Sequence, residues 1–126
     1  MTPKILVVED EELMLKALQF RLGKEGYDVF IAKDGMQALK LISETQFDLV
    51  ITDIMLPFVG GLEIVNKIKS DPETKDTPVI VLSAVGLEKT VMEAFQLGAN
   101  DFITKPFNLS ELSIRVRKNL RVPVTK

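Results

Sequence analysis

The chain has 126 residues, of which 18 are acidic and 16 are basic, giving a formal net charge of −2. This length fits one domain, and this charge balance gives no argument for nucleic acid or a membrane surface as a partner. Cysteine and histidine are both absent, which excludes disulfides, thiol chemistry and metal sites built from thiolate or imidazole ligands. Any bound metal would therefore be a hard cation held by oxygen atoms.

The first predicted element is a buried strand at Ile5–Val8, an apolar run rich in β-branched residues. This run is too short for a signal peptide or a membrane-spanning helix, so we expect a cytoplasmic protein without a membrane partner. Gly23 and Gly26 predict the end of the helix that follows. Its apolar residues recur on one helical face: Met14, Ala17, Leu18 and Leu22.

The same strand–helix cycle then repeats four times. Apolar runs predict strands at Tyr27–Ala32, Leu49–Thr52, Val79–Leu82 and Phe102–Thr104. Residues at helical spacing follow each run: Ala38, Leu41 and Ile42; Ile64, Val65 and Ile68; Val91, Ala94, Phe95 and Gly98; and Leu109, Leu112, Val116 and Leu120. Five such units predict an α/β fold, with a doubly wound parallel sheet between two helix layers. We expect one domain over residues 1–121, with residues 122–126 as a tail or truncated linker.

Polar side chains follow four of the predicted strands: Glu9 and Asp10, then Asp53, Ser83 and Lys105. In an open parallel sheet, ligands bind beyond the carboxyl ends of the strands, so these residues would meet at one edge. Taken singly, each has an ordinary structural explanation. Asp10 fits a helix N-cap, Asp53 the start of a turn, Ser83 a strand-end hydroxyl and Lys105 a surface lysine.

Taken together, three carboxylates at one edge would take up protons or splay apart unless a cation joins them, because two carboxylates about 4 Å apart repel by roughly 4 kcal/mol at an effective dielectric of 20. Mg²⁺ is the natural candidate, and carboxylate–Mg²⁺ sites are typical of phosphoryl chemistry. The sequence has no P-loop or GxGxxG motif, and no Asp-x-Asp pair of the kind expected in an aspartate phosphatase. Asp53 is therefore predicted to be an isolated carboxylate nucleophile that forms an acyl phosphate.

Five motifs, in order, resemble the response-regulator receiver domain of bacterial two-component signalling: VVEDEE (7–12), DLVITDIMLP (48–57), GGLEIV (60–65), PVIVLSA (78–84) and GANDFITKPF (98–107). The resemblance covers residues 3–121. It implies a flavodoxin-like, CheY-like fold with a five-stranded sheet in the order 2-1-3-4-5. It also implies a signalling domain rather than an enzyme, with at most slow self-phosphorylation from small donors and slow self-dephosphorylation.

The resemblance further implies that Asp53 is the phosphoacceptor, which receives a phosphoryl group from a sensor histidine kinase or a phosphotransfer protein. The missing histidine fits this role, because the donor imidazole would belong to the partner. Mg²⁺ would be the cofactor. Its ligands would be Asp10, Asp53 and the backbone carbonyl of Met55, with Glu9 holding it through water.

The same resemblance implies that the phosphoryl oxygens are bound by Lys105, by Ser83 and by the backbone of Ala84, with a cis bond between Lys105 and Pro106. Ser83 would also be a switch hydroxyl that moves inward, so that Phe102 rotates into the space it leaves. That motion would repack the surface formed by the fourth helix, fifth strand and fifth helix, and would bias two existing states. The alternative is that Phe102 is simply a partly buried strand aromatic.

This surface is similar to that of DNA-binding receivers that form homodimers. Asp101, Glu111 and Arg115 match charged positions used across such dimers, whereas Val91 and Asn100 depart from the usual pattern. The alternative is that Glu111 and Arg115 form a pair on one helix. Two rival functions also stay open: a Mg²⁺-dependent phosphatase or nuclease, and a receiver-like module that binds partners without phosphorylation. We expect no direct nucleic-acid binding by this domain.

Overall fold

Strands and helices alternate along the computed structural model, which describes residues 2–84 and 86–120. Within these residues the strands are β1 (Lys4–Val8), β2 (Asp28–Ala32), β3 (Leu49–Asp53), β4 (Val79–Ala84) and β5 (Asp101–Lys105). The helices are α1 (Glu12–Lys24), α2 (Gly35–Glu44), α3 (Gly61–Ser70), α4 (Glu88–Leu97) and α5 (Leu109–Asn119). The predicted strand–helix units are confirmed, and each strand ends within two residues of its expected limits.

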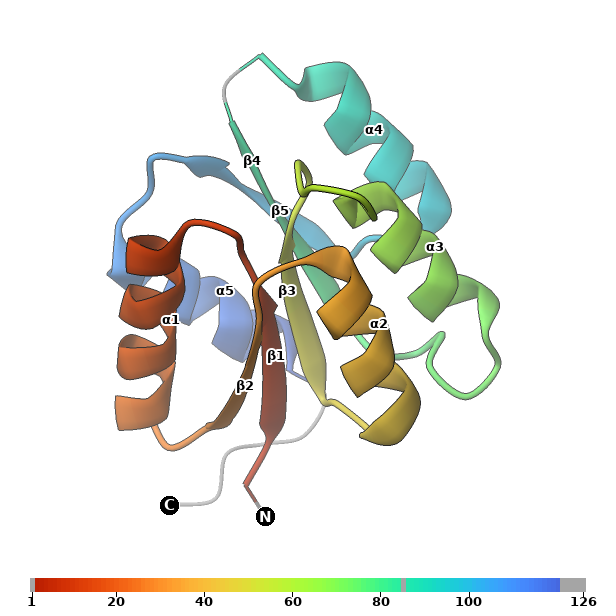
Figure 1. Cartoon of the computed structure of the whole chain (residues 1–126). Helices are drawn as coiled ribbons and strands as arrows, with labels where there is room; N and C mark the ends of the chain where they lie inside the picture. The colour runs from red at the N-terminus through yellow and green to blue at the C-terminus, as the bar shows by residue number, and fades with distance from the viewer. Residues whose placement is uncertain (1, 85, 121–126) are drawn as a thin grey trace.

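The strands form one parallel sheet in the order β2-β1-β3-β4-β5, which confirms the predicted doubly wound arrangement. Figure 1 shows α1 and α5 on one face of this sheet, and α2, α3 and α4 on the other. The connection after β1 leads to β2 at one edge of the sheet, whereas the connection after β3 leads to β4 on the other side. The carboxyl ends of these two strands therefore form the switch point at which such sheets bind ligands.

The central strands supply side chains to two separate cores. Ile5 and Val7 of β1 pack in the core formed with α1 and α5. Leu6 and Val8 of the same strand pack in the core formed with α2, α3 and α4. All four side chains are fully buried. A strand covered on both faces needs apolar residues at consecutive positions, which explains the unbroken apolar run at the start of the sequence.

The helix ends differ from expectation in two places. Helix α1 begins after Glu11, whose side chain makes no capping hydrogen bond, so Asp10 is not the N-cap. Gly98 lies just outside α4 rather than on its apolar face, because its φ of 115° ends the helix in a left-handed conformation. By contrast, Asp34 caps α2 by accepting a hydrogen bond from the backbone N–H of Gln37 at 2.8 Å.

A polar contact ties α1 to α5. The buried hydroxyl of Ser113 donates to the carboxylate of Glu25 at 2.6 Å, and Arg21 donates to the same carboxylate at 3.0 Å. Burial alone raises the pKa of Glu25, but these two hydrogen bonds and the charges of Arg21 and Arg117 together outweigh burial and hold the pKa below its ordinary value. The ionised carboxylate therefore stabilises the contact between the two helices at neutral pH.

Among the described residues, no helix combines the length and the apolar content needed to cross a membrane. The tail predicted at residues 122–126 lies outside the described residues. The domain boundary at residue 121 therefore stays a prediction.

Candidate functional site

The carboxyl ends of β1 and β3 bring three acids together. The strand register pairs Val8 with Thr52, so the next residues along the two strands, Glu9 and Asp53, are neighbours at the sheet edge. Asp10 follows Glu9 directly, and carboxylate oxygens from the three acids all lie within 4.8 Å of one another. The acids therefore meet as the sequence predicts.

Asp53 is the last residue of β3 and is only 7% exposed. Its two carboxylate oxygens have different partners. Oδ1 accepts a hydrogen bond from the backbone N–H of Met55 at 3.1 Å, and Oδ2 accepts one from the ammonium of Lys105 at 2.5 Å. The carboxylate is therefore held in one orientation at the edge of the sheet.

Lys105, the last residue of the edge strand β5, contacts two of the acids. The register of β5 pairs this residue with Ala84 of β4, and its Nζ lies 2.7 Å from Oε1 of Glu9 as well as 2.5 Å from Asp53. Burial alone lowers the pKa of the ammonium, but the hydrogen bonds and charges of Asp53 and Glu9 outweigh burial and raise it. Lys105 is therefore a charged bridge between the two buried carboxylates.

Glu9 is fully buried. Oε1 accepts the hydrogen bond from Lys105, and Oε2 accepts one from the backbone N–H of Glu11 at 3.1 Å. Burial raises the pKa of Glu9 above its ordinary value of 4.5; the two hydrogen bonds oppose this rise, whereas the charge of Asp53 adds to it. Ionised Glu9 therefore depends on nearby positive charge.

The donor set of this cluster fits a hard divalent cation. Three carboxylates meet one ammonium, so full ionisation of the acids leaves two negative charges (three minus one) without a partner in the cluster. The backbone carbonyl of Met55, in the loop directly after Asp53, adds a further oxygen at the same sheet edge. Mg²⁺ takes a few carboxylate oxygens and keeps several waters, which matches this set. Elsewhere in residues 2–84 and 86–120, no other trio of acidic side chains is as close.

The two predicted switch residues lie on β4 and β5. Ser83 is buried, and its hydroxyl donates weakly to the carbonyl of Ala84 at 3.4 Å. The register pairs Ser83 with Thr104, the residue before Lys105. Phe102 is 36% exposed, and its ring packs edge-on against Phe95 of α4 with centroids 5.8 Å apart. Phe102 thus occupies the position of a partly exposed strand aromatic.

An apolar cavity of about 290 Å³ lies between Ser83 and Phe102 on one side and α4 on the other. Leu87, Val91 and Phe95 form much of its wall. The cavity therefore adjoins both predicted switch side chains.

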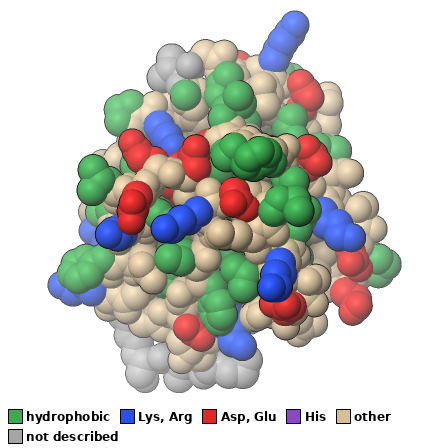
Figure 2. Space-filling model, in the orientation of Figure 1, with side chains coloured by type: hydrophobic (Ala, Val, Ile, Leu, Met, Phe, Trp, Pro, Cys, Tyr) green, Lys and Arg blue, Asp and Glu red, His purple; other side chains and the backbone are tan. Residues whose placement is uncertain are grey.

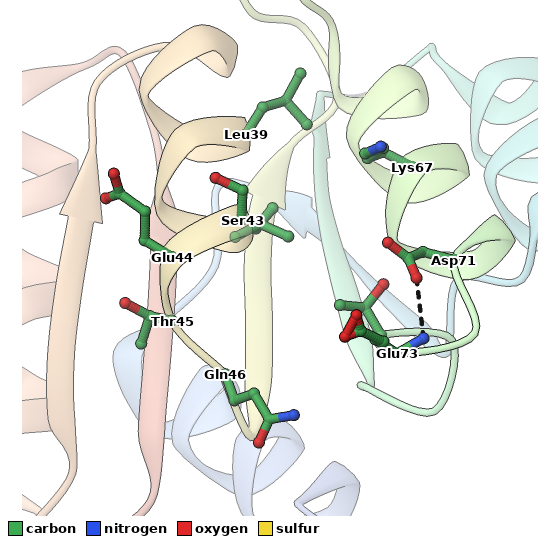
Figure 3. A pocket seen from close by; sticks show the side chains of 10 residues that line it. Leu39, Ser43, Glu44, Thr45, Gln46, Lys67, Asp71 and Glu73 are labelled. Atoms are coloured by element: carbon green, nitrogen blue, oxygen red, sulfur yellow. Dashed lines mark hydrogen bonds between the residues drawn. The ribbon is translucent and has the colours of Figure 1, made fainter.

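A second cavity, of about 300 Å³, lies between α2 and α3, and its lining includes Glu44, Lys67 and Asp71 (Figure 3). Asp71 accepts a hydrogen bond there from the backbone N–H of Glu73 at 2.9 Å. None of the three clustered acids lines this cavity. Figure 2 shows acidic, basic and hydrophobic side chains interspersed on one face of the molecule, so surface charge does not identify the site either.

The remaining predicted residues are also placed. The bond between Lys105 and Pro106 is cis, as expected. Arg115 donates to Asp101 at 2.6 Å and lies 3.7 Å from Glu111, so the charges proposed for a dimer are paired within one chain. Glu111 and Arg115 therefore form the alternative arrangement, an ion pair within α5. Their role in a dimer stays a prediction.

Comparison with protein families decides the class of this site. The model of the response regulator receiver domain matches residues 5–117. The chain belongs to the response regulator receiver family. Receivers are the phosphoryl-accepting signalling domains of two-component systems, and they interact with histidine kinases or phosphotransfer proteins.

Solved receivers match this one over nearly its whole length. The receiver domain of the Francisella response regulator 1452 is 32% identical, with a TM-score of 0.84, covering 94% of this chain and 96% of that one. A response regulator receiver domain protein from Clostridium thermocellum is 31% identical, with a TM-score of 0.86 and 93% of each chain covered. The chemotaxis response regulator CheY4 of Vibrio cholerae is 30% identical, with a TM-score of 0.88, covering 95% and 100%. The predicted CheY-like fold is confirmed.

Proposed function

We propose that this receiver is a phosphorylation-activated switch with Asp53 as its phosphoacceptor. The observation that carries the proposal is the contact between Asp53 and Lys105 inside a cluster of three acids at the switch point of the sheet. A carboxylate nucleophile, a cation for phosphoryl oxygens and a donor set for a hard metal are the parts that this transfer requires.

The transfer exchanges one bond to phosphorus for another. A carboxylate oxygen of Asp53 forms the new P–O bond while the P–N bond to the donor imidazole breaks, and the electron pair of the broken bond stays on nitrogen. The N–H of Met55 holds the attacking carboxylate in orientation through Oδ1. The ammonium of Lys105, now on Oδ2, can pair with a phosphoryl oxygen once the bond has formed.

Mg²⁺ is the proposed cofactor. Asp10, Asp53 and the Met55 carbonyl would hold it directly, and Glu9 would hold it through water. When bound, Mg²⁺ offsets the negative charge that collects on the phosphoryl oxygens. Ser83 and the backbone N–H of Ala84, at the end of the neighbouring strand, would bind further phosphoryl oxygens.

The signal would pass through Ser83 and Phe102. Phosphorylation replaces a single negative charge on Asp53 with a group near −2 that has three acceptor oxygens, and the Ser83 hydroxyl moves to donate to one of them. The apolar cavity beside Ser83 gives the Phe102 ring room to turn inward from its partly exposed position. The phosphoryl group would thereby favour one of two packings of α4, β5 and α5.

The output surface that we propose is formed by α4, β5 and α5. It would bind an output domain, a separate partner or a second copy of this chain. In a homodimer, Asp101, Glu111 and Arg115 would have to exchange their present pairing within the chain for pairing across the interface.

Phosphorylation by a small donor tests the proposed function. We expect the chain to gain one phosphoryl group from acetyl phosphate in the presence of Mg²⁺, measured as intact mass. The gain should be lost with EDTA and in Asp53→Asn, while Asp71→Asn, which changes an aspartate outside the site, should be phosphorylated like the wild type. The phosphoryl group should then be lost slowly by self-dephosphorylation. No gain under any condition would favour the module that works without phosphorylation, and steady hydrolysis of a phosphoester would favour the phosphatase.

A further inference from the structure

The loop between β3 and α3 exposes an aromatic ring on an unfavourable backbone. Phe58 is 89% exposed and has a φ of 68°. Among the described residues, it is the one non-glycine residue with positive φ. The left-handed conformation is disfavoured for side chains with a Cβ, and a bulky residue there is a true outlier. Folding alone would favour glycine or asparagine at this position, because both adopt that conformation easily.

The surrounding structure enforces this conformation. The Val59 backbone lies so close to Gly35 of α2 that a Cβ at Gly35 would overlap it, and would lie 2.5 Å from the Val59 Cβ. At the other end of the loop, the N–H of Gly61 donates to the carbonyl of Ile54 at 2.9 Å. The loop is therefore fixed at both ends. Strain of this kind persists where the fold holds it, and it clusters at functional sites.

Phe58 lies on the loop next to Asp53, which a phosphodonor protein must approach. Its loop leaves the sheet at Asp53 and returns to the same point, since Gly61 packs against the backbone of Asp53 and Ile54. Because Asp53 is only 7% exposed, a protein-bound imidazole reaches it only if the donor surface closes over the surrounding loops. Two further apolar side chains are each 62% exposed: Met55 on this loop, and Met36 on α2, the helix packed against it.

We propose that Phe58 is a preformed aromatic anchor for the protein that donates the phosphoryl group, and that this donor presents an apolar recess beside its phosphohistidine. The inference rests on the proposed function of Asp53. A rigid, convex ring loses little conformational freedom on binding, and aromatic residues are enriched in the cores of protein interfaces. Met36 and Met55 supply adaptable apolar contacts around the ring. Phe58 would thus select the donor without taking part in the chemistry.

Two donors with the same bond to phosphorus test this role. Phosphoramidate carries a P–N bond but no protein surface, whereas an autophosphorylated sensor-kinase core carries both. The kinase core used is the one, from a purified panel, that phosphorylates the wild type fastest. In Phe58→Asn we expect the rate from phosphoramidate with Mg²⁺ to stay within twofold of the wild type, and the second-order rate constant from the kinase to fall at least tenfold.

Three comparisons make this test decisive. Phe58→Tyr keeps the ring and should keep the rate from the kinase. Asp71→Asn changes a side chain at the C-terminal end of α3 and should leave both rates unchanged. Phe58→Asn should unfold at a temperature no lower than the wild type, since asparagine relieves the backbone strain. Equal rates from the kinase for Phe58→Asn and the wild type would overturn the anchor. Failure of phosphoramidate to label the wild type would instead overturn the role of Asp53.

Discussion

Replacing Gly61 with alanine is expected to lower the free energy of unfolding by about 2–3 kcal/mol, as overpacking of a tight site does. The added Cβ would overlap the carbonyl oxygen of Asp53 and lie 2.7 Å from the Cα of Ile54. Both neighbours are backbone atoms, so relief requires movement of the chain that carries the phosphoacceptor. Phosphorylation by acetyl phosphate should therefore slow as well, even at temperatures where the variant is fully folded.

The adjacent glycine provides a matched control for this prediction. A Cβ on Gly60 would meet only the carbonyl oxygen of Ile54, at an ordinary 3.7 Å, and its φ of −80° suits any residue. Gly60→Ala should therefore cost no more than about 1 kcal/mol, the usual cost of alanine at an N-cap. Urea denaturation of both variants measures the difference. Equal stabilities for the two variants would show that the loop backbone moves at little cost to accept the added Cβ. Gly61 would then not fix the position of Asp53.

Removing the ammonium of Lys105 is the second large change. In Lys105→Met, Glu9 and Asp53 lose the cation that bridges them, and we expect the free energy of unfolding at pH 7 to fall by about 2–3 kcal/mol in EDTA. That value lies below the usual cost of breaking a buried ion pair because the Lys105 side chain is 23% exposed. Saturating Mg²⁺ should restore part of the loss, since a bound cation stabilises the folded state.

The sign of the pH dependence follows from the two raised pKa values. The raised pKa of Lys105 means that its stabilising contribution is fully present at pH 7 and is lost only as pH rises through that pKa. The pKa of Glu9 is raised even with Lys105 present, so ionised Glu9 costs stability once its cation is gone. As pH falls from 7 toward the ordinary value of 4.5, Glu9 takes up a proton, and the difference between variant and wild type should shrink.

An exposed ion pair is the control for Lys105. Lys16 lies 3.4 Å from Glu12, with side chains that are 69% and 62% exposed, so Lys16→Met should cost less than about 1 kcal/mol. Urea denaturation at pH 7 and pH 5 measures both variants. A Lys105 deficit that grows at lower pH would contradict the assignment of Glu9 as the acid that depends on this cation.

The fold was predictable because its signals are local and redundant. The run Ile5–Val8 is apolar without a break because both sheet faces are covered, and the strand register then carries Glu9 to the side of Asp53. The sequence pattern was less reliable for the end of a helix, where a single capping residue decides the position. Asp10 has the chemistry of an N-cap, yet Glu11 occupies that position, and Asp10 lies instead in the acid cluster.

The site was predictable in its members but not in its contacts. Sequence placed Lys105 near the acids, but it gave no signal that the ammonium reaches the buried Glu9 at 2.7 Å. It also gave no signal for the left-handed conformation of Phe58, because phenylalanine is a residue type that rarely adopts it. Side-chain reach and backbone strain depend on packing between distant segments, which spacing along the chain does not encode.

Chemical trapping of the phosphorylated residue tests the central claim most directly. Wild-type chain treated with acetyl phosphate and Mg²⁺ is reduced with borohydride, which converts an aspartyl phosphate into homoserine and releases phosphate. Peptide mass spectrometry then locates the reduced residue. We predict homoserine at position 53 and at no other acid, and none when Mg²⁺ is withheld. Reduction at Asp10 or at another carboxylate, or no reduced residue after confirmed exposure to the donor, would contradict the assignment of Asp53 as the phosphoacceptor.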